Sequence, residues 1–170
     1  HISKKFNQVI TEMSNTEPIV INRRYYTFDP EDPIEKRELH GFSDASEQAY
    51  GCCVYLKSLK QSGNFEVNLV ASKSRVRPLK KKKKKKYTVP RLELLGNFIL
   101  SKLMVVIMQS LKNEINIDDY RCYTDSMITL AWIKSIDKEL KTFCQNRVVQ
   151  IRKNTDVDKW FYCKSKKNPG

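Results

Sequence analysis

The stretch Leu39-His40-Gly41-Phe42-Ser43-Asp44 alternates apolar and polar side chains and ends on an acid. Alternation with a period of two residues is typical of a β-strand that buries one face. A carboxylate at the end of such a strand costs free energy unless a partner pairs with it or a cation binds it. This stretch therefore predicts a strand and a functional acid, Asp44.

Two further acids stand in comparable places. Asp125 ends a second strand-like run, Tyr120-Arg121-Cys122-Tyr123-Thr124-Asp125, and Glu93 lies in the first turn of an apolar helix that we expect to start near Thr88. Each acid taken alone could merely cap a local element: Asp125 could cap the helix that starts at Ser126, and Glu93 could favour a positive helix N-terminus. Three carboxylates on two strands and one helix instead predict a site for a hard cation such as Mg²⁺, which prefers oxygen ligands.

The remaining pattern predicts a single α/β domain with a mixed sheet. Short polar turns separate the first three strands, which favours antiparallel hairpins. A crossover helix then leads to a fourth strand, which we expect to lie parallel to the first. On this topology Asp44 and Asp125 emerge at one edge of the sheet. The expected strands are 38–44, 49–56, 65–73, 120–125 and 160–163, and the expected helices are 88–111, 126–135 and one from 142, with Val106, Ile128 and Ala131 facing the core.

The 170 residues carry a formal net charge of +13, which points to an anionic partner. Part of this charge is the run Lys80–Lys86, which we expect to be a low-complexity, disordered loop before the first long helix. The chain stays basic without that run. The basic residues that flank the start of the helix predict a nucleic-acid-binding surface; they are Lys73, Arg75, Arg77 and Arg91.

Several other classes of protein are disfavoured. The five cysteines include no C-x-x-C pair and the only histidines are His1 and His40, so a zinc site is not expected. The most apolar stretch, 98–108, is too short to span a bilayer, and we expect no membrane partner. An aspartic peptidase would need Asp-Ser/Thr-Gly, whereas Asp125 and Ser126 are followed by Met127.

Longer motifs carry a family resemblance. The motifs are Leu39-His40-Gly41-Phe42-Ser43-Asp44-Ala45-Ser46, the stretch 71–79, Val89-Pro90-Arg91-Leu92-Glu93-Leu94, Tyr123-Thr124-Asp125-Ser126 and Ala131-Trp132-Ile133. Together they resemble the ribonuclease H domain of BEL/Pao retrotransposon polyproteins over residues 38–170. Residues 1–37 resemble the end of the connection that follows the reverse transcriptase.

The resemblance implies a ribonuclease H-like fold with a five-stranded mixed sheet. It also implies hydrolysis of the RNA strand of RNA/DNA hybrids during reverse transcription, with Asp44, Glu93 and Asp125 as catalytic ligands of two Mg²⁺ or Mn²⁺ ions. The reverse transcriptase domain of the same polyprotein and an intracellular location are expected as well.

Near its end the sequence departs from the family pattern. Tyr162 stands where that pattern has a histidine, and Lys167 stands where it has an aspartate. The fourth metal-binding aspartate of the pattern would fall just past Gly170. We therefore expect impaired hydrolysis. The alternative is a decayed retrotransposon remnant that acts at most as a basic nucleic-acid-binding module.

Overall fold

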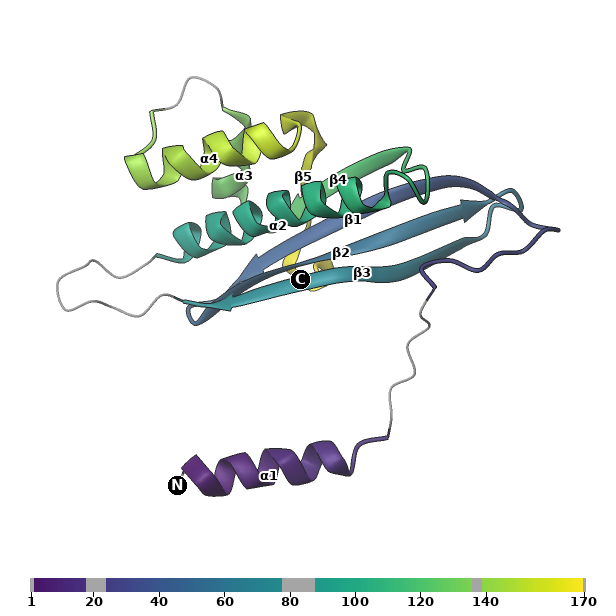
Figure 1. Ribbon diagram of the computed structural model, residues 1–170. Helices are drawn as coiled ribbons and strands as arrows, with labels where there is room; N and C mark the ends of the chain where they lie inside the picture. Colours follow the sequence, from purple (N-terminus) through teal and green to yellow (C-terminus); the bar gives the residue numbers. More distant parts are fainter. Residues whose placement is uncertain (1, 18–23, 78–87, 136–138, 170) are drawn as a thin grey trace.

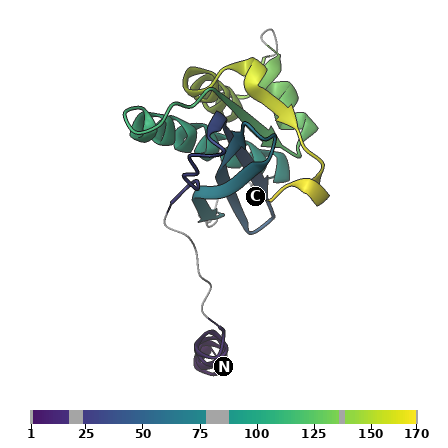
Figure 2. The same ribbon diagram turned by 90° about the vertical axis from the view of Figure 1, so that its right-hand side faces the viewer.

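The structure, a computed structural model, describes residues 2–17, 24–77, 88–135 and 139–169, so the lysine run 80–86 lies outside the described residues. A five-stranded sheet carries three helices over one face, and a further helix, α1 (Ile2–Ser14), lies away from it (Figures 1 and 2). In chain order the sheet and its helices are β1 (Ile34–Ala45), β2 (Ala49–Lys60), β3 (Phe65–Val76), α2 (Val89–Leu111), β4 (Asp119–Thr124), α3 (Met127–Lys134), α4 (Thr142–Asn154) and β5 (Trp160–Tyr162). Two short 3-10 helices, η1 (Val157–Lys159) and η2 (Ser165–Lys167), flank β5.

The strand order β3-β2-β1-β4-β5 confirms the expected mixed sheet. β1 pairs antiparallel with β2, β2 pairs antiparallel with β3, and β4 runs parallel to both β1 and β5. The first strand begins earlier than expected, at Ile34, because its start still pairs with the end of β2, where Ile34 lies opposite Lys60. Ser43 lies opposite Thr124, and this register fixes the place of the acid that follows each of them.

Helix α2 lies on β1 and β2 and packs against α4, and half of its apolar side chains are buried (Figure 1). Gly41 of β1 permits this contact, since a Cβ atom at that position would lie 2.6 Å from Leu100 Cδ1. By length and composition α2 could also cross a membrane, but half of its most apolar window is buried in this core. Val106 was expected to face the core, yet it is 56% exposed, because it lines an open groove that α2 forms with β3 and α4.

Helices α3 and α4 complete the layer beside α2. Ile128 and Ala131 of α3 were expected to point inward, but both are exposed, and Thr129, Leu130 and Ile133 are buried instead. The cap explains the difference: Ser126 Oγ accepts a hydrogen bond from the Thr129 N–H at 3.3 Å and so sets the phase of the helix. Arg152 of α4 ties the two helices together by donating to the carbonyl oxygens of Trp132, Ile133 and Ser135.

Candidate active site

The sheet brings two of the predicted acids to one edge. Asp44 is the second-last residue of β1, and Asp125 directly follows β4. Because β1 and β4 are parallel, with Ser43 opposite Thr124, these two acids occupy equivalent places. Glu93 comes from α2, just after its first turn rather than within it, since the helix begins at Val89.

Gly96 brings α2 close to this edge. A Cβ atom at Gly96 would lie 3.3 Å from the carbonyl oxygen of Asp44 and 3.4 Å from that of Gly51. A glycine inside a helix costs about 1 kcal/mol relative to alanine. The glycine lies where α2 touches the strand that carries Asp44, so the loss of helix stability accompanies a close contact that a larger side chain would hinder. This close approach holds Glu93 near the same edge.

Asp125 acts electrostatically on both other carboxylates, and Asp44 acts on Glu93. Burial raises the pKa of Asp44, the nearby Asp125 raises it further, and the hydrogen bond from the Ala45 N–H works in the opposite direction. Burial also raises the pKa of Glu93, with added repulsion from Asp125 and Asp44, while a hydrogen bond with the Ser126 side chain opposes the rise. Like charges that are partly removed from water disfavour each other's ionised form, and a bound cation would relieve them.

The donor set fits a hard divalent cation, because all three side chains offer carboxylate oxygens. Their spacing does not yet form a site: among the residues that the structure describes, no three His, Cys, Asp or Glu side chains lie close enough to hold a metal ion as they stand. Asp125 Oδ2 accepts a hydrogen bond from Ser165 Oγ at 2.8 Å, and Asp44 Oδ1 accepts one from the Ala45 N–H at 2.7 Å. The serine hydroxyl would compete with a cation for Asp125 Oδ2, while Oδ1 of the same carboxylate could still bind it.

A buried chain of hydrogen bonds, which the sequence reasoning missed, runs behind the acids. Ser43 Oγ donates to Asn97 Oδ1, and Asn97 Nδ2 donates to Thr129 Oγ1 at 2.9 Å. Thr129 Oγ1 donates in turn to the Ser126 carbonyl oxygen at 3.2 Å.

These residues are the neighbours of the acids in sequence. Ser43 precedes Asp44, Ser126 follows Asp125, and Asn97 lies one helical turn after Glu93. The chain of hydrogen bonds therefore joins β1, which carries Asp44, α2, which carries Glu93, and the start of α3, which follows Asp125. The signal that could have revealed it is Asn97, a polar residue in the apolar stripe of α2.

The segment after β5 lies against the same edge. Asn168 Nδ2 donates to the Ser43 carbonyl oxygen at 2.9 Å, and the Cys53 thiol lies 3.6 Å from the Pro169 carbonyl oxygen. With the contact between Ser165 and Asp125, this segment spans both strand ends. Lys167 belongs to it, as the last residue of η2, and is exposed.

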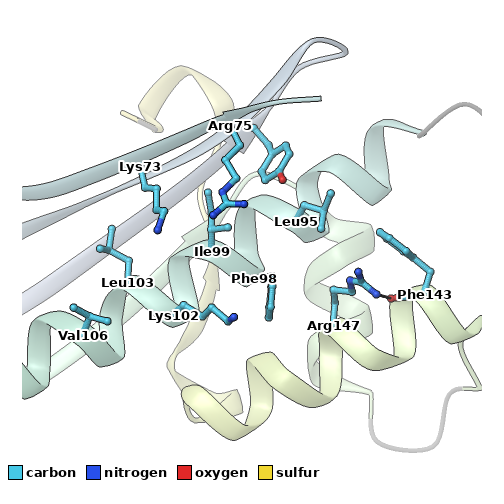
Figure 3. A pocket seen from close by; sticks show the side chains of 11 residues that line it. Lys73, Arg75, Leu95, Phe98, Ile99, Lys102, Leu103, Val106, Phe143 and Arg147 are labelled. Atoms are coloured by element: carbon cyan, nitrogen blue, oxygen red, sulfur yellow. Dashed lines mark hydrogen bonds between the residues drawn. The ribbon is translucent and has the colours of Figure 1, made fainter. Parts of the chain in front are cut away.

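The four predicted nucleic-acid-binding residues are only partly gathered. Lys73 and Arg75 project from β3 toward α2 and line a groove with side chains of α2 and α4 (Figure 3). Arg91 lies beside this groove, with its guanidinium 5.2 Å from the centre of the Phe143 ring. Arg77 follows β3, where its backbone N–H donates to the Gln48 carbonyl oxygen, and it does not line the groove.

Comparison with known proteins assigns the sequence to a family. A family model described as the Pao retrotransposon-like RNaseH-like domain matches residues 1–126. No curated protein sequence matches the chain.

Three solved structures align with the chain, and the first of them supports the fold. The N-terminal RNase H domain of rv2228c from Mycobacterium tuberculosis, solved as a fusion with maltose-binding protein, aligns with a TM-score of 0.50 at 11% identity, over 77% of this chain and 85% of that one. RNase H1 from the archaeon Halobacterium salinarum aligns with a TM-score of 0.44 at 9% identity, over 78% of this chain and 91% of that one. A foamy viral protease-reverse transcriptase solved with an RNA/DNA hybrid is matched over 89% of this chain but only 20% of its own, with a TM-score of 0.42 at 10% identity.

Proposed function

Because the chain belongs to the Pao retrotransposon-like RNaseH-like domain family, we propose that it hydrolyses the RNA strand of RNA/DNA hybrids with the help of Mg²⁺ or Mn²⁺. The proposal is supported by the equivalent places of Asp44 and Asp125 at the ends of two parallel strands, with Glu93 near enough for both of these acids to raise the pKa of its carboxyl group. The end of β1, the residue after β4 and helix α2 supply these acids, and a shared cation would require their carboxylate oxygens to converge on it.

The three carboxylates would hold the cations, and the buried chain of hydrogen bonds behind them would fix their orientation. Divalent ions bound there would activate a water molecule and stabilise the leaving oxygen of the phosphodiester. The residues of this chain contribute the placement: Asp44 through the end of β1, Asp125 through the end of β4, and Glu93 through the close approach of α2 at Gly96.

Turnover by the present chain is proposed to be slow. Asp125 is engaged by Ser165, and Lys167 lies two residues further along the same segment, adding positive charge on the side where a cation would bind. Both features would weaken the binding of a cation. They also support the second candidate function, a nucleic-acid-binding module without turnover, because the basic surface does not depend on the carboxylates.

The context of the domain belongs to the proposal as well. We propose residues 1–37 as the tail of the reverse transcriptase connection and residues 38–170 as the ribonuclease H-like domain. The reverse transcriptase of the same polyprotein would be its partner, and an intracellular particle or the nucleus would be its location. Co-purification of the domain with that reverse transcriptase would test the partnership.

Cleavage of a labelled hybrid tests the catalytic proposal. The assay compares the chain with its Asp125→Asn variant in Mn²⁺, on an RNA/DNA hybrid and on a DNA duplex of the same sequence. We expect slow cleavage of the RNA strand only, lost in Asp125→Asn and in EDTA. Hybrid binding without any cleavage would favour the module without turnover, and cleavage that survives Asp125→Asn would refute the proposed site.

A further inference from the structure

A basic groove on the helical side of the sheet, separate from the carboxylates, is not used by the proposed chemistry. It has a volume of about 510 Å³ and lies between β3, α2 and α4 (Figure 3). Lys73 and Arg75 reach into it from β3, Lys102 from α2 and Arg147 from α4. We refer to these four residues and the space between them as the basic groove.

The charges of the basic groove are not balanced within it. Its described lining contains four cations and no carboxylate. Ion pairs elsewhere on the described surface use other cations, such as Lys60 with Glu66 and Lys159 with Asp119. Concentrated positive charge of this kind attracts a polyanion and gains from its binding.

Aromatic rings contact two of the four cations. Arg147 lies 4.2 Å from the centre of the Phe143 ring, and Lys102 lies 4.6 Å from the centre of the Phe98 ring. Cation–π contacts restrict a long side chain while its charge stays available. Because cations already lie over these rings, stacking of bases on them is not the favoured mode of binding. The basic groove is better suited to a string of phosphates than to individual bases.

The basic groove also leads toward the carboxylates. Phe143 contacts Arg147 inside the groove and Arg91 beside it, so the cations continue from the groove to the first turn of α2, the helix that carries Glu93. On the sheet side, Arg75 of β3 lies opposite Tyr50 of β2 in the strand register. Tyr50 in turn lies opposite Ala45, the residue of β1 that follows Asp44. A nucleic acid held at the carboxylate edge could therefore continue along cations of both layers.

We propose that the basic groove binds the sugar–phosphate backbone of the nucleic acid beyond the site of cleavage, without reading its bases. This inference rests on the proposed function, since it takes the hybrid to be the nucleic acid at the carboxylate edge. Lys73, Arg75, Lys102 and Arg147 provide the phosphate contacts. The rings of Phe98 and Phe143 position two of these cations.

Salt-dependent binding tests the groove independently of cleavage. The measurement is the fluorescence anisotropy of a labelled hybrid in EDTA, between 50 and 200 mM KCl. The test variant is Lys73→Gln with Lys102→Gln, and the matched control is Lys112→Gln with Lys153→Gln, which removes the same charge from exposed lysines outside the groove. Each lost phosphate contact lowers the slope of log K against log salt by about 0.9.

We expect the slope to fall by about 1.8 in the groove variant and to stay unchanged in the control. Equal slopes in the two variants would overturn the proposal. A blunt hybrid and a hybrid with a single-stranded tail show whether duplex or single-stranded phosphates occupy the groove. Polyglutamate is tested as a competitor that displaces the labelled hybrid. If the groove variant weakens polyglutamate binding as much as it weakens hybrid binding, the proposal is overturned in favour of an acidic protein as the partner.

The same samples separate this proposal from the catalytic one. Cleavage in Mn²⁺ is scored with Asp125→Asn, whereas the salt slope in EDTA is scored with the groove variant and its control, so each proposal has its own variant and its own readout. Absence of cleavage by every variant would defeat the proposed catalytic function, while the difference in slope would still decide the role of the groove.

Discussion

Replacing Asn97 with alanine should destabilise the protein by about 3 kcal/mol. The Asn97 side chain is fully buried and joins Ser43 of β1 to Thr129 of α3. Two lost hydrogen bonds cost about 2 kcal/mol in all, and the space left by the shorter side chain adds about 1 kcal/mol. Such a loss is a large part of the roughly 5–15 kcal/mol that stabilises an ordinary domain.

Urea unfolding followed by far-UV circular dichroism measures this loss. We expect a lower midpoint with an unchanged slope, because the area exposed on unfolding stays nearly the same. The control is Asn116→Ala, whose exposed side chain only donates to the nearby Asp118, and its effect should stay within about 0.5 kcal/mol. An Asn97→Ala protein as stable as this control would refute the idea that the buried chain of hydrogen bonds holds the three elements together.

Three further outcomes are expected. Gly96→Ala should destabilise the protein, although alanine favours a helix by about 1 kcal/mol, because the new Cβ meets the Asp44 carbonyl oxygen at 3.3 Å; a rise in melting temperature would contradict this. The pKa of Glu93 is raised in the folded protein, so the stability of the wild type falls as the pH rises from the ordinary glutamate range through the folded pKa. Glu93→Gln should therefore have a higher melting temperature than the wild type at pH 7 and lose that advantage in acid. A difference in melting temperature that stays constant across pH would contradict this. Arg152→Gln should cost about 1.5–3 kcal/mol, since its guanidinium donates to carbonyl oxygens at the end of α3, whereas the exposed neighbour Lys153→Gln should be nearly neutral in the same denaturation assay.

The sheet could be predicted from the sequence because its signals are local. Alternation around Leu39 and the apolar run that ends at Thr124 each define a strand, and polar turns between the first three strands define their antiparallel pairing. The crossover helix then leaves β4 parallel to β1, which is the pairing observed. The close approach at Gly96 was also predictable, because a glycine inside an apolar helix needs a packing reason.

The structural details that the sequence did not predict depend on contacts between distant segments. The inward face of α3 could not be read from its apolar residues, because Ser126 sets where the helix starts and thereby exposes Ile128. The predicted basic residues did not form one cluster. Lys102 and Arg147, which complete the basic groove, come from helices whose packing the sequence alone does not fix. The hydrogen bond from Ser165 to Asp125 likewise depends on how the segment after β5 folds back.

Binding of Mn²⁺ is the decisive measurement for a cation shared by Asp44, Glu93 and Asp125. Electron paramagnetic resonance of free Mn²⁺ in a titration with the protein measures binding whether or not turnover is slow. We predict binding by the wild-type chain that weakens in each of Asp44→Asn, Glu93→Gln and Asp125→Asn, and that strengthens in Ser165→Ala, which releases Asp125 from its hydrogen bond. Binding that is equal in the wild type and all three carboxylate variants would show that these acids share no cation.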